Sequence, residues 1–214
     1  MLAYWLPSTA LVSERARRRY GVEARTANGV VLTFDDGPHP EGTPAVLEAL
    51  GDLRATFFLV GEQVERRPEL VARILAAGHE IGVHCHRHRN LLWLGPRAVR
   101  DDLDRAAALI ADAAGRAPTL YRPPYGILNK AALAEARTRG WRTLLWSVDG
   151  KDWRRRATPR SVEARILERI GPGDVVLLHD SDAYGASWRN SAGALPGLVQ
   201  RLGEQSPAPS WRPA

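Results

Sequence analysis

Short apolar segments alternate with helical segments along the whole chain, and this alternation constrains the fold more than any other feature. Apolar runs bounded by turn residues predict buried strands at residues 30–34, 55–60, 80–83, 119–121, 142–148 and 174–178. Helical patterns occupy residues 9–19, 44–50, 64–77, 96–114, 129–139, 159–170 and 192–202. Strands that alternate with helices are typical of parallel β/α organisation. We therefore expect an α/β fold with parallel strands.

Polar side chains follow five of these strands at the point where each strand ends. They are Asp35 with Asp36, His84, Arg122, Asp149 and His179. The carboxyl ends of the strands in a β/α barrel share one face, and that face carries the chemistry. A packed core needs none of these groups, and burying them without partners is costly. The pattern therefore predicts a functional site.

The first of these strand ends reads Thr33-Phe34-Asp35-Asp36-Gly37-Pro38. Successive strand residues point to opposite sides, so the two carboxylates could do different jobs within a few ångströms of each other. One could hold a metal ion while the other stays free as a base. By itself the motif is more typical of an acidic turn or of a cap on the next helix.

The third strand leads into His84-Cys85-His86-Arg87-His88. On a helix or a tight turn, His84 and His88 could reach one metal ion, and Asp36 would complete a set of two histidines and one aspartate. The alternative is a group of exposed histidines without a ligand. His86 would point elsewhere if the stretch is helical. Cys85 could compete as a soft ligand or could be a small side chain beside the site.

Two later stretches are also candidates for catalytic or substrate-binding groups. The prolines of Tyr121-Arg122-Pro123-Pro124-Tyr125-Gly126 would fix neighbouring backbone N–H groups, although the stretch could be an ordinary loop. Tryptophans flank Asp149 and Asp152, and aromatic faces beside polar groups suit sugar rings, although tryptophans are also common in cores. His179 is a candidate general acid because the pKa of histidine lies near neutrality.

Composition bears on the number of domains, the possible charged partners and the presence of disulfides. A chain of 214 residues with 44% hydrophobic residues suits one globular domain with a sizeable core. The formal charge is +6, and the clusters at 15–19 and 154–156 could meet nucleic acid, anionic glycan or lipid head groups, or could be solvated faces. Cys85 is the single cysteine, so no intrachain disulfide can form.

The sequence carries no clear signal for a membrane or for secretion. No apolar run reaches the roughly 18 residues that a membrane helix needs. Residues 1–12 are a poor signal peptide, because they have no preceding positive charge and no clear cleavage site. The chain as written is therefore expected in the cytoplasm, and export would require a longer native N-terminus.

Five motifs together resemble the polysaccharide deacetylases, which form carbohydrate esterase family 4. They are Thr-Phe-Asp-Asp-Gly-Pro (33–38), His-x₃-His (84–88), Arg-Pro-Pro-Tyr (122–125), Asp-Gly-Lys-Asp-Trp (149–153) and Leu-Leu-His-Asp (177–180). All five occur in order between residue 30 and about residue 200. The resemblance implies a distorted, incomplete (β/α) barrel of parallel strands and a divalent metal, most often Zn²⁺, with Co²⁺, Ni²⁺ or Mn²⁺ as alternatives.

The resemblance also implies roles for individual residues. Asp36, His84 and His88 would bind the metal, Asp35 would be the general base, and Arg122 would orient Asp35. The Tyr125 N–H would help to stabilise the oxyanion, and His179 would be the general acid, held by Asp152. The implied substrate-binding residues are Trp153, Leu177 and Pro124, and Trp188 is added from the segment 181–191, which we expect to border the cleft. Cys85 departs from the family, which usually has Ser, Thr or a small residue there.

These inferences lead to one main hypothesis, a metal-dependent hydrolase that removes N-acetyl groups from an amino-sugar polymer, oligosaccharide or glycoside. The alternatives are an inactive carbohydrate-binding protein of the same fold and a deacylase of a non-carbohydrate amide. We expect no nucleic-acid partner, no transmembrane segment and a monomer. The expected organisation is an N-terminal extension (1–29) with a short basic helix, a catalytic domain (30–205) and a loose tail (206–214).

Overall fold

The protein is described here by a computed structural model that covers residues 13–27, 29–182, 185 and 187–203. The expected tail at 206–214 lies outside these residues. Within them, eight strands form one parallel sheet in the order β1-β6-β5-β4-β3-β2-β8-β7. The strands are β1 (Val22–Glu23), β2 (Val31–Asp35), β3 (Ala55–Leu59), β4 (Glu80–Val83), β5 (Leu120–Tyr121), β6 (Arg142–Leu144), β7 (Val148–Asp149) and β8 (Val175–His179).

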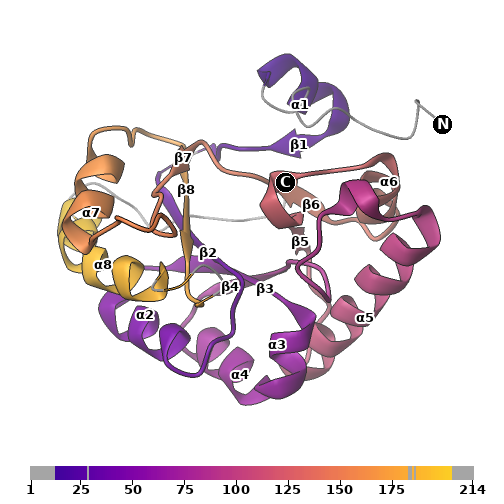
Figure 1. The fold of residues 1–214 in the computed structure, drawn as a ribbon, viewed down its shortest axis with the longest axis horizontal. Coiled ribbons are helices and arrows are strands. Elements are labelled where there is room, and N and C mark those ends of the chain that lie inside the picture. Colours follow the sequence, from indigo (N-terminus) through magenta and orange to yellow (C-terminus); the bar gives the residue numbers. More distant parts are fainter. Residues whose placement is uncertain (1–12, 28, 183–184, 186, 204–214) are drawn as a thin grey trace.

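The sheet is a curled, incomplete barrel, as expected (Figure 1). β6 lies next to one edge and β7 forms the opposite edge, yet only residues 145–147 connect them. Four residues of extended chain span at most about 14 Å, so the two edges must approach each other. Within this crossing, Leu145 N–H donates to Glu23 of β1 and Ser147 N–H donates to Val175 of β8.

The helices lie on the outside of the curved sheet (Figure 1). They are α1 (Glu14–Tyr20), α2 (Gly42–Leu50), α3 (Gly61–Arg66), α4 (Pro68–Ala76), α5 (Pro96–Ala114), α6 (Lys130–Thr138), α7 (Pro159–Leu167) and α8 (Ser187–Gly203). Short 3₁₀ turns occur at η3 (Leu91–Trp93) and η4 (Pro124–Gly126). None of the helices in the described part of the chain is both long and apolar enough to cross a membrane.

Strand alternation divides the buried side chains into two cores. Phe34 of β2, Phe57 of β3 and Leu178 of β8 face outward and pack in the large core between sheet and helices. Phe58, Leu120, Leu144 and Val175 face inward and form a small core inside the barrel. Alternate residues of β2 and β8 face inward, and the last of them are Asp35 and His179. The same alternation that builds the inner core therefore delivers polar groups to its open end.

Three expected elements differ from the observed ones. The strand expected at 142–148 is two strands, because residues 145–147 change edges. The helix expected at 64–77 begins at Gly61 and is broken at Arg67, since a residue before proline disfavours helical angles. The last helix begins at Ser187 rather than at residue 192. In addition β1, which lies in the expected N-terminal extension, joins the sheet.

Candidate active site

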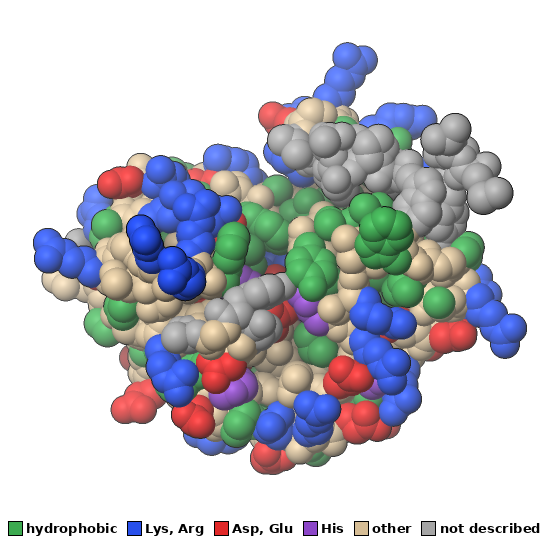
Figure 2. Space-filling model, in the orientation of Figure 1, with side chains coloured by type: hydrophobic (Ala, Val, Ile, Leu, Met, Phe, Trp, Pro, Cys, Tyr) green, Lys and Arg blue, Asp and Glu red, His purple; other side chains and the backbone are tan. Residues whose placement is uncertain are grey.

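A cavity of about 280 Å³ opens at the carboxyl ends of the strands. Its lining consists of Asp35, His84, His88, Tyr125, Trp146, Asp149, Trp153, Leu177 and His179. Figure 2 shows a hollow on this face, with hydrophobic side chains around it and histidine and acidic side chains deeper inside. The polar groups that end the strands thus meet in one place, with apolar walls beside them.

Asp35 and Asp36 both turn toward this site although they are successive residues. Asp35 is the last residue of β2 and faces inward. Ordinary strand geometry would point the next side chain outward. Asp36 instead has a φ of 75°, in the left-handed region. This backbone turn re-aims its carboxylate. As a result Nε2 of His84 lies 3.7 Å from Oδ2 of Asp35 and 3.3 Å from Oδ1 of Asp36.

Asp36, His84 and His88 could share one metal ion. Each offers one ligand atom, and these atoms lie within 4.8 Å of one another. Oδ1 of Asp36 lies 3.2 Å from Nε2 of His88. His84 Nδ1 is 2.8 Å from the carbonyl oxygen of Arg122, which can only accept, so Nδ1 carries the proton and Nε2 keeps its lone pair for a ligand.

Two further observations fit a cation at this position. Both carboxylate oxygens of Asp36 are buried, and neither has a hydrogen-bond partner among the described residues. Burial alone would raise the pKa of Asp36, but contact with His84 and the nearby imidazoles hold it below its usual value. Burial and the neighbouring His84 lower the pKa of His88 to about 4, which favours the neutral imidazole that metals bind. Two imidazoles with one carboxylate are a common zinc set.

The loop that carries His84 and His88 is not helical. Its backbone reverses at Cys85, which has a φ of 66°. The Cys85 thiol is fully buried and lies 3.9 Å from the Tyr121 hydroxyl, on the outer side of the sheet. It is therefore directed away from the candidate ligands. His86 is buried against Gly61, where an added Cβ would lie 2.7 Å from its Nδ1.

Helices on both sides hold this loop in place. From α3, Gly61 N–H donates to the Cys85 carbonyl and Glu62 N–H donates to that of His86. From α5, Oδ2 of the buried Asp102 accepts from His86 N–H at 2.7 Å, and Oδ1 accepts from Arg89 at 2.7 Å. Sequence reasoning missed Asp102, because one aspartate in an amphipathic helix carries no signal of a partner 16 residues away.

Arg122 connects the site to the barrel interior. Its side chain is fully buried and donates to Oδ1 of Asp35 at 2.7 Å and to the Thr33 hydroxyl at 2.7 Å. It also donates to the carbonyls of Leu144 and Leu145, where the chain leaves β6. One planar guanidinium thus fixes the orientation of Asp35 and ties β2 to the crossing segment. The orienting role that the family resemblance implies needs this contact with Asp35, and the role itself stays a prediction.

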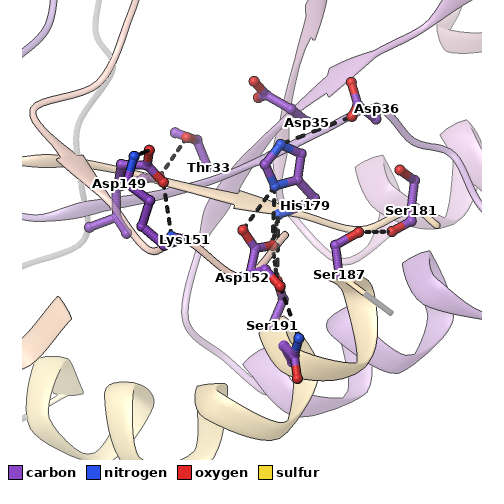
Figure 3. Close-up of polar contacts among 12 residues, drawn as sticks. Thr33, Asp35, Asp36, Asp149, Lys151, Asp152, His179, Ser181, Ser187 and Ser191 are labelled. Carbon is purple, nitrogen blue, oxygen red and sulfur yellow. Dashed lines mark hydrogen bonds and ion pairs between the residues drawn. The ribbon is translucent and has the colours of Figure 1, made fainter. Parts of the chain in front are cut away.

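His179 stands on another side of the cavity and is held from below by Asp152 (Figure 3). His179 Nδ1 lies 3.0 Å from Oδ1 of Asp152, while its Nε2 lies 4.0 Å from Oδ2 of Asp36. Burial lowers the pKa of His179, but the charge of Asp152 and its hydrogen bond dominate and raise it to about 10. The imidazole is therefore protonated at neutral pH, so Nε2 carries a proton.

Asp152 has a second partner that sequence reasoning missed. Ser191 of α8 donates to Oδ2 of Asp152 at 2.7 Å, and the same oxygen accepts from the backbone N–H of His179. Asn190 also donates to the backbone carbonyl of Asp152. The serine, glycine and asparagine residues of this stretch are typical of loops, so the sequence did not indicate a helix that begins at Ser187. Neither contact was therefore expected.

Tyr125 occupies a turn with a φ of 59°. Gly126 and Ile127 donate the hydrogen bonds that close this turn, to Pro123 and Pro124, and the Tyr125 N–H takes no part in them. The Tyr125 ring packs against His88 with a centroid distance of 4.5 Å. Tyr125 lines the cavity, and the hydrogen bonds of the turn do not use its N–H.

The expected substrate-binding residues divide into two groups. Trp153 and Leu177 line the cavity, and Trp153 is more than one-third exposed. Pro124 and Trp188 are not among the lining residues. Trp188 lies near the start of α8, packed near His39 and beneath the Arg189 guanidinium, 4.2 Å from the ring centroid.

Comparison with known proteins gives a consistent picture. The family model described as "Polysaccharide deacetylase" matches residues 23–144. The chain is similar to a chitooligosaccharide deacetylase from Bradyrhizobium, with 42% identity over 167 residues, 77% of this chain and 75% of the relative. The described fold resembles that of the Bc1960 peptidoglycan N-acetylglucosamine deacetylase, with a TM-score of 0.82, 31% identity and coverage of 94% and 92% of the two chains. A family 4 carbohydrate esterase from Streptomyces lividans, solved in complex with acetate, gives a TM-score of 0.74, 33% identity and coverage of 84% and 90%.

Proposed function

This chain belongs to the polysaccharide deacetylase family, and from that premise we propose that it removes N-acetyl groups from an amino-sugar polymer or oligosaccharide in a metal-dependent reaction. It is a carbohydrate esterase family 4 hydrolase of the chitooligosaccharide and peptidoglycan deacetylase type. The observation that carries the proposal is geometric. Asp36, His84 and His88 converge, while Asp35 stays beside them, bonded to Arg122 instead.

The metal site would consist of Asp36, His84 and His88. The two unsatisfied oxygens of Asp36 support this assignment, because a buried carboxylate without partners is otherwise costly. A divalent ion held there would polarise the amide carbonyl of the substrate and make an attacking water more acidic. The donor set favours Zn²⁺ and also accommodates Co²⁺, Ni²⁺ or Mn²⁺.

The residues of the chain supply the proton transfers. Asp35 lines the cavity and accepts a proton from the attacking water, while Arg122 holds its other oxygen in place. The Tyr125 N–H donates to the carbonyl oxygen as negative charge develops on it. His179 protonates the departing amine from Nε2, and Asp152 retains the resulting neutral imidazole through Nδ1. Acetate and the free amino sugar are the products.

The test is acetate release from N-acetylglucosamine oligomers, from peptidoglycan and from small acetylated metabolites, measured before and after chelator treatment and after Zn²⁺ is restored. We expect release that chelator abolishes and Zn²⁺ recovers. Bound metal with no release from either carbohydrate would favour an inactive carbohydrate-binding protein. Release only from small acetylated metabolites would favour a deacylase of non-carbohydrate amides.

A further inference from the structure

We propose that Arg154, Arg155 and Arg156 form a rim that binds carboxylate groups of the glycan substrate, on a sugar adjoining the N-acetylated one. This inference rests on the proposed function, because it assigns part of the same substrate. It narrows the substrate class from any N-acetylated glycan to a negatively charged one.

The arginine rim stands directly beside the cavity. The loop begins at Asp152, which is buried against His179, and the next residue, Trp153, lines the cavity. The guanidinium of Arg154 lies 5.9 Å from the centroid of the Trp153 ring. Nζ of Lys151 lies 5.2 Å from the same centroid, so cationic groups border this wall of the cavity, and a sugar bound against Trp153 would lie close to Arg154.

No described residue neutralises the charges of the arginine rim. Lys151, which directly precedes this loop, is paired with Asp149 at 2.7 Å. In the loop of His84, Arg87 pairs with Glu62 and Arg89 pairs with Asp102. By contrast, no carboxylate among the described residues lies within ion-pair distance of the three exposed guanidinium groups of the rim. Figure 2 shows Lys and Arg side chains gathered on the part of this face near α7 and β7.

The loop is also held in a defined conformation. Arg154 N–H donates to the Lys151 carbonyl, and Ala157 N–H donates to the Arg154 carbonyl at 2.8 Å. Thr158 then caps α7 through a reciprocal pair of hydrogen bonds with Ser161. A fixed backbone at both ends reduces the entropy that is lost when the side chains bind a ligand.

A glycan suits this surface better than a membrane or a nucleic acid does. The charges occupy one short loop and are continuous with an aromatic wall of the reaction cavity. A carboxylate offers the planar, bidentate partner that a guanidinium prefers. Because the groups are exposed, their attraction should be strongly screened by salt.

The experiment measures binding of two soluble tetrasaccharides of equal length to the full chain, by calorimetry in the presence of Zn²⁺. One is the neutral N-acetylglucosamine tetramer, and the other alternates N-acetylglucosamine with N-acetylmuramic acid, which carries carboxylates. The chain carries Asp35→Asn so that neither ligand is consumed. We expect the anionic tetramer to bind on the order of tenfold more tightly at 20 mM salt, with the preference lost at about 500 mM salt.

The triple variant Arg154→Gln, Arg155→Gln, Arg156→Gln should lose this preference. The matched control removes the same charge from α1, which precedes the amino end of β1, by the substitutions Arg15→Gln, Arg18→Gln and Arg19→Gln. This control should keep the preference for the anionic tetramer. Equal binding of the two tetramers, or a preference that survives the rim substitutions, would overturn the inference. So would rim-dependent binding to phosphatidylglycerol vesicles without any preference between the tetramers. Acetate release by the wild type tests the proposed function separately.

Discussion

Two adjacent carboxylates with different surroundings are the central feature at the scale of single residues. Asp35 lies in the regular strand and is bonded to Arg122, whereas Asp36 lies in a left-handed turn with both oxygens unsatisfied. The division into a base and a ligand that we propose would follow from backbone geometry, since the two side chains are chemically identical.

Asp35→Asn should therefore retain the metal and lose turnover. The amide keeps the size of the side chain but cannot accept a proton, so we expect kcat to fall by at least about 100-fold. Steady-state acetate release and metal content measured on the same preparation provide the check. A variant with wild-type kcat would rule out Asp35 as the base.

The sequence located the residues of the site better than their conformations. Strand alternation and turn residues indicated Asp35, His84, Arg122 and His179 at strand ends, and the structure brings them together. The positive φ angles of Asp36 and Cys85 could not be predicted, because non-glycine residues adopt them only when tertiary contacts compensate.

At the scale of elements, the loop between β4 and η3 depends on the helices beside it. Its left-handed turn at Cys85 is unfavourable by itself, and its N–H groups are satisfied by Asp102 of α5. Val99, Leu103 and Ile110 of α5 are buried at helical spacing, but a pattern of apolar residues says nothing about a buried carboxylate among them.

Asp102→Asn should weaken metal binding while the protein stays folded. Removing one charge-assisted contact to the loop should raise the dissociation constant for Zn²⁺ on the order of tenfold, since supporting groups of metal ligands have effects of that size. Competition with a chromophoric chelator measures the constant. Asp101→Asn is the matched control, because Asp101 is exposed on the same helix. Equal affinities of the two variants would contradict the role of Asp102.

A second element-scale prediction concerns His79, which joins the start of β4 to β3. Its Nδ1 accepts from Ala55 N–H at 3.2 Å, so the neutral ring is the form that fits the fold. Burial lowers the pKa of His79 from 6.5 to about 4. The stabilising contribution of the neutral ring is thus fully present above pH 6.5 and is lost as the pH falls from about 6.5 to 4, by up to about 3 kcal/mol.

His79→Gln retains an acceptor but cannot be protonated in this range. The variant should show a smaller loss of unfolding free energy between pH 7 and pH 4 than the wild type, measured by urea denaturation. Identical pH dependences would show that His79 does not titrate on unfolding.

At the scale of the whole molecule, a short crossing and one buried side chain hold the two sides of the incomplete barrel together. Residues 145–147 carry the chain from β6 to β7, and Arg122 bonds to their start and to β2. The sequence predicted parallel strands and a barrel, yet it showed 142–148 as one apolar run. The change of edge depends on partners in β1 and β8, which a local pattern does not contain.

Arg122→Lys should destabilise the whole fold. The ammonium keeps the charge but cannot reproduce four hydrogen bonds in a plane, and the buried charge pair with Asp35 would be weakened. We expect a loss of about 2–4 kcal/mol in unfolding free energy, measured by chemical denaturation. Arg105→Lys, in an exposed pair with Glu65, should leave the denaturation midpoint unchanged. A denaturation midpoint of Arg122→Lys equal to that of the wild type would contradict the role of Arg122 in holding the two sides of the barrel together.

The most direct test of the account is the number of divalent metal ions per chain in four proteins, measured by mass spectrometry of the metal content after loading with Zn²⁺. Asparagine tolerates left-handed angles, so Asp36→Asn removes a ligand with little backbone strain. The account predicts one ion per chain in the wild type and in Asp35→Asn, and none in Asp36→Asn or His88→Gln. A full equivalent in Asp36→Asn, or loss of the ion in Asp35→Asn, would contradict the division of roles between the two carboxylates.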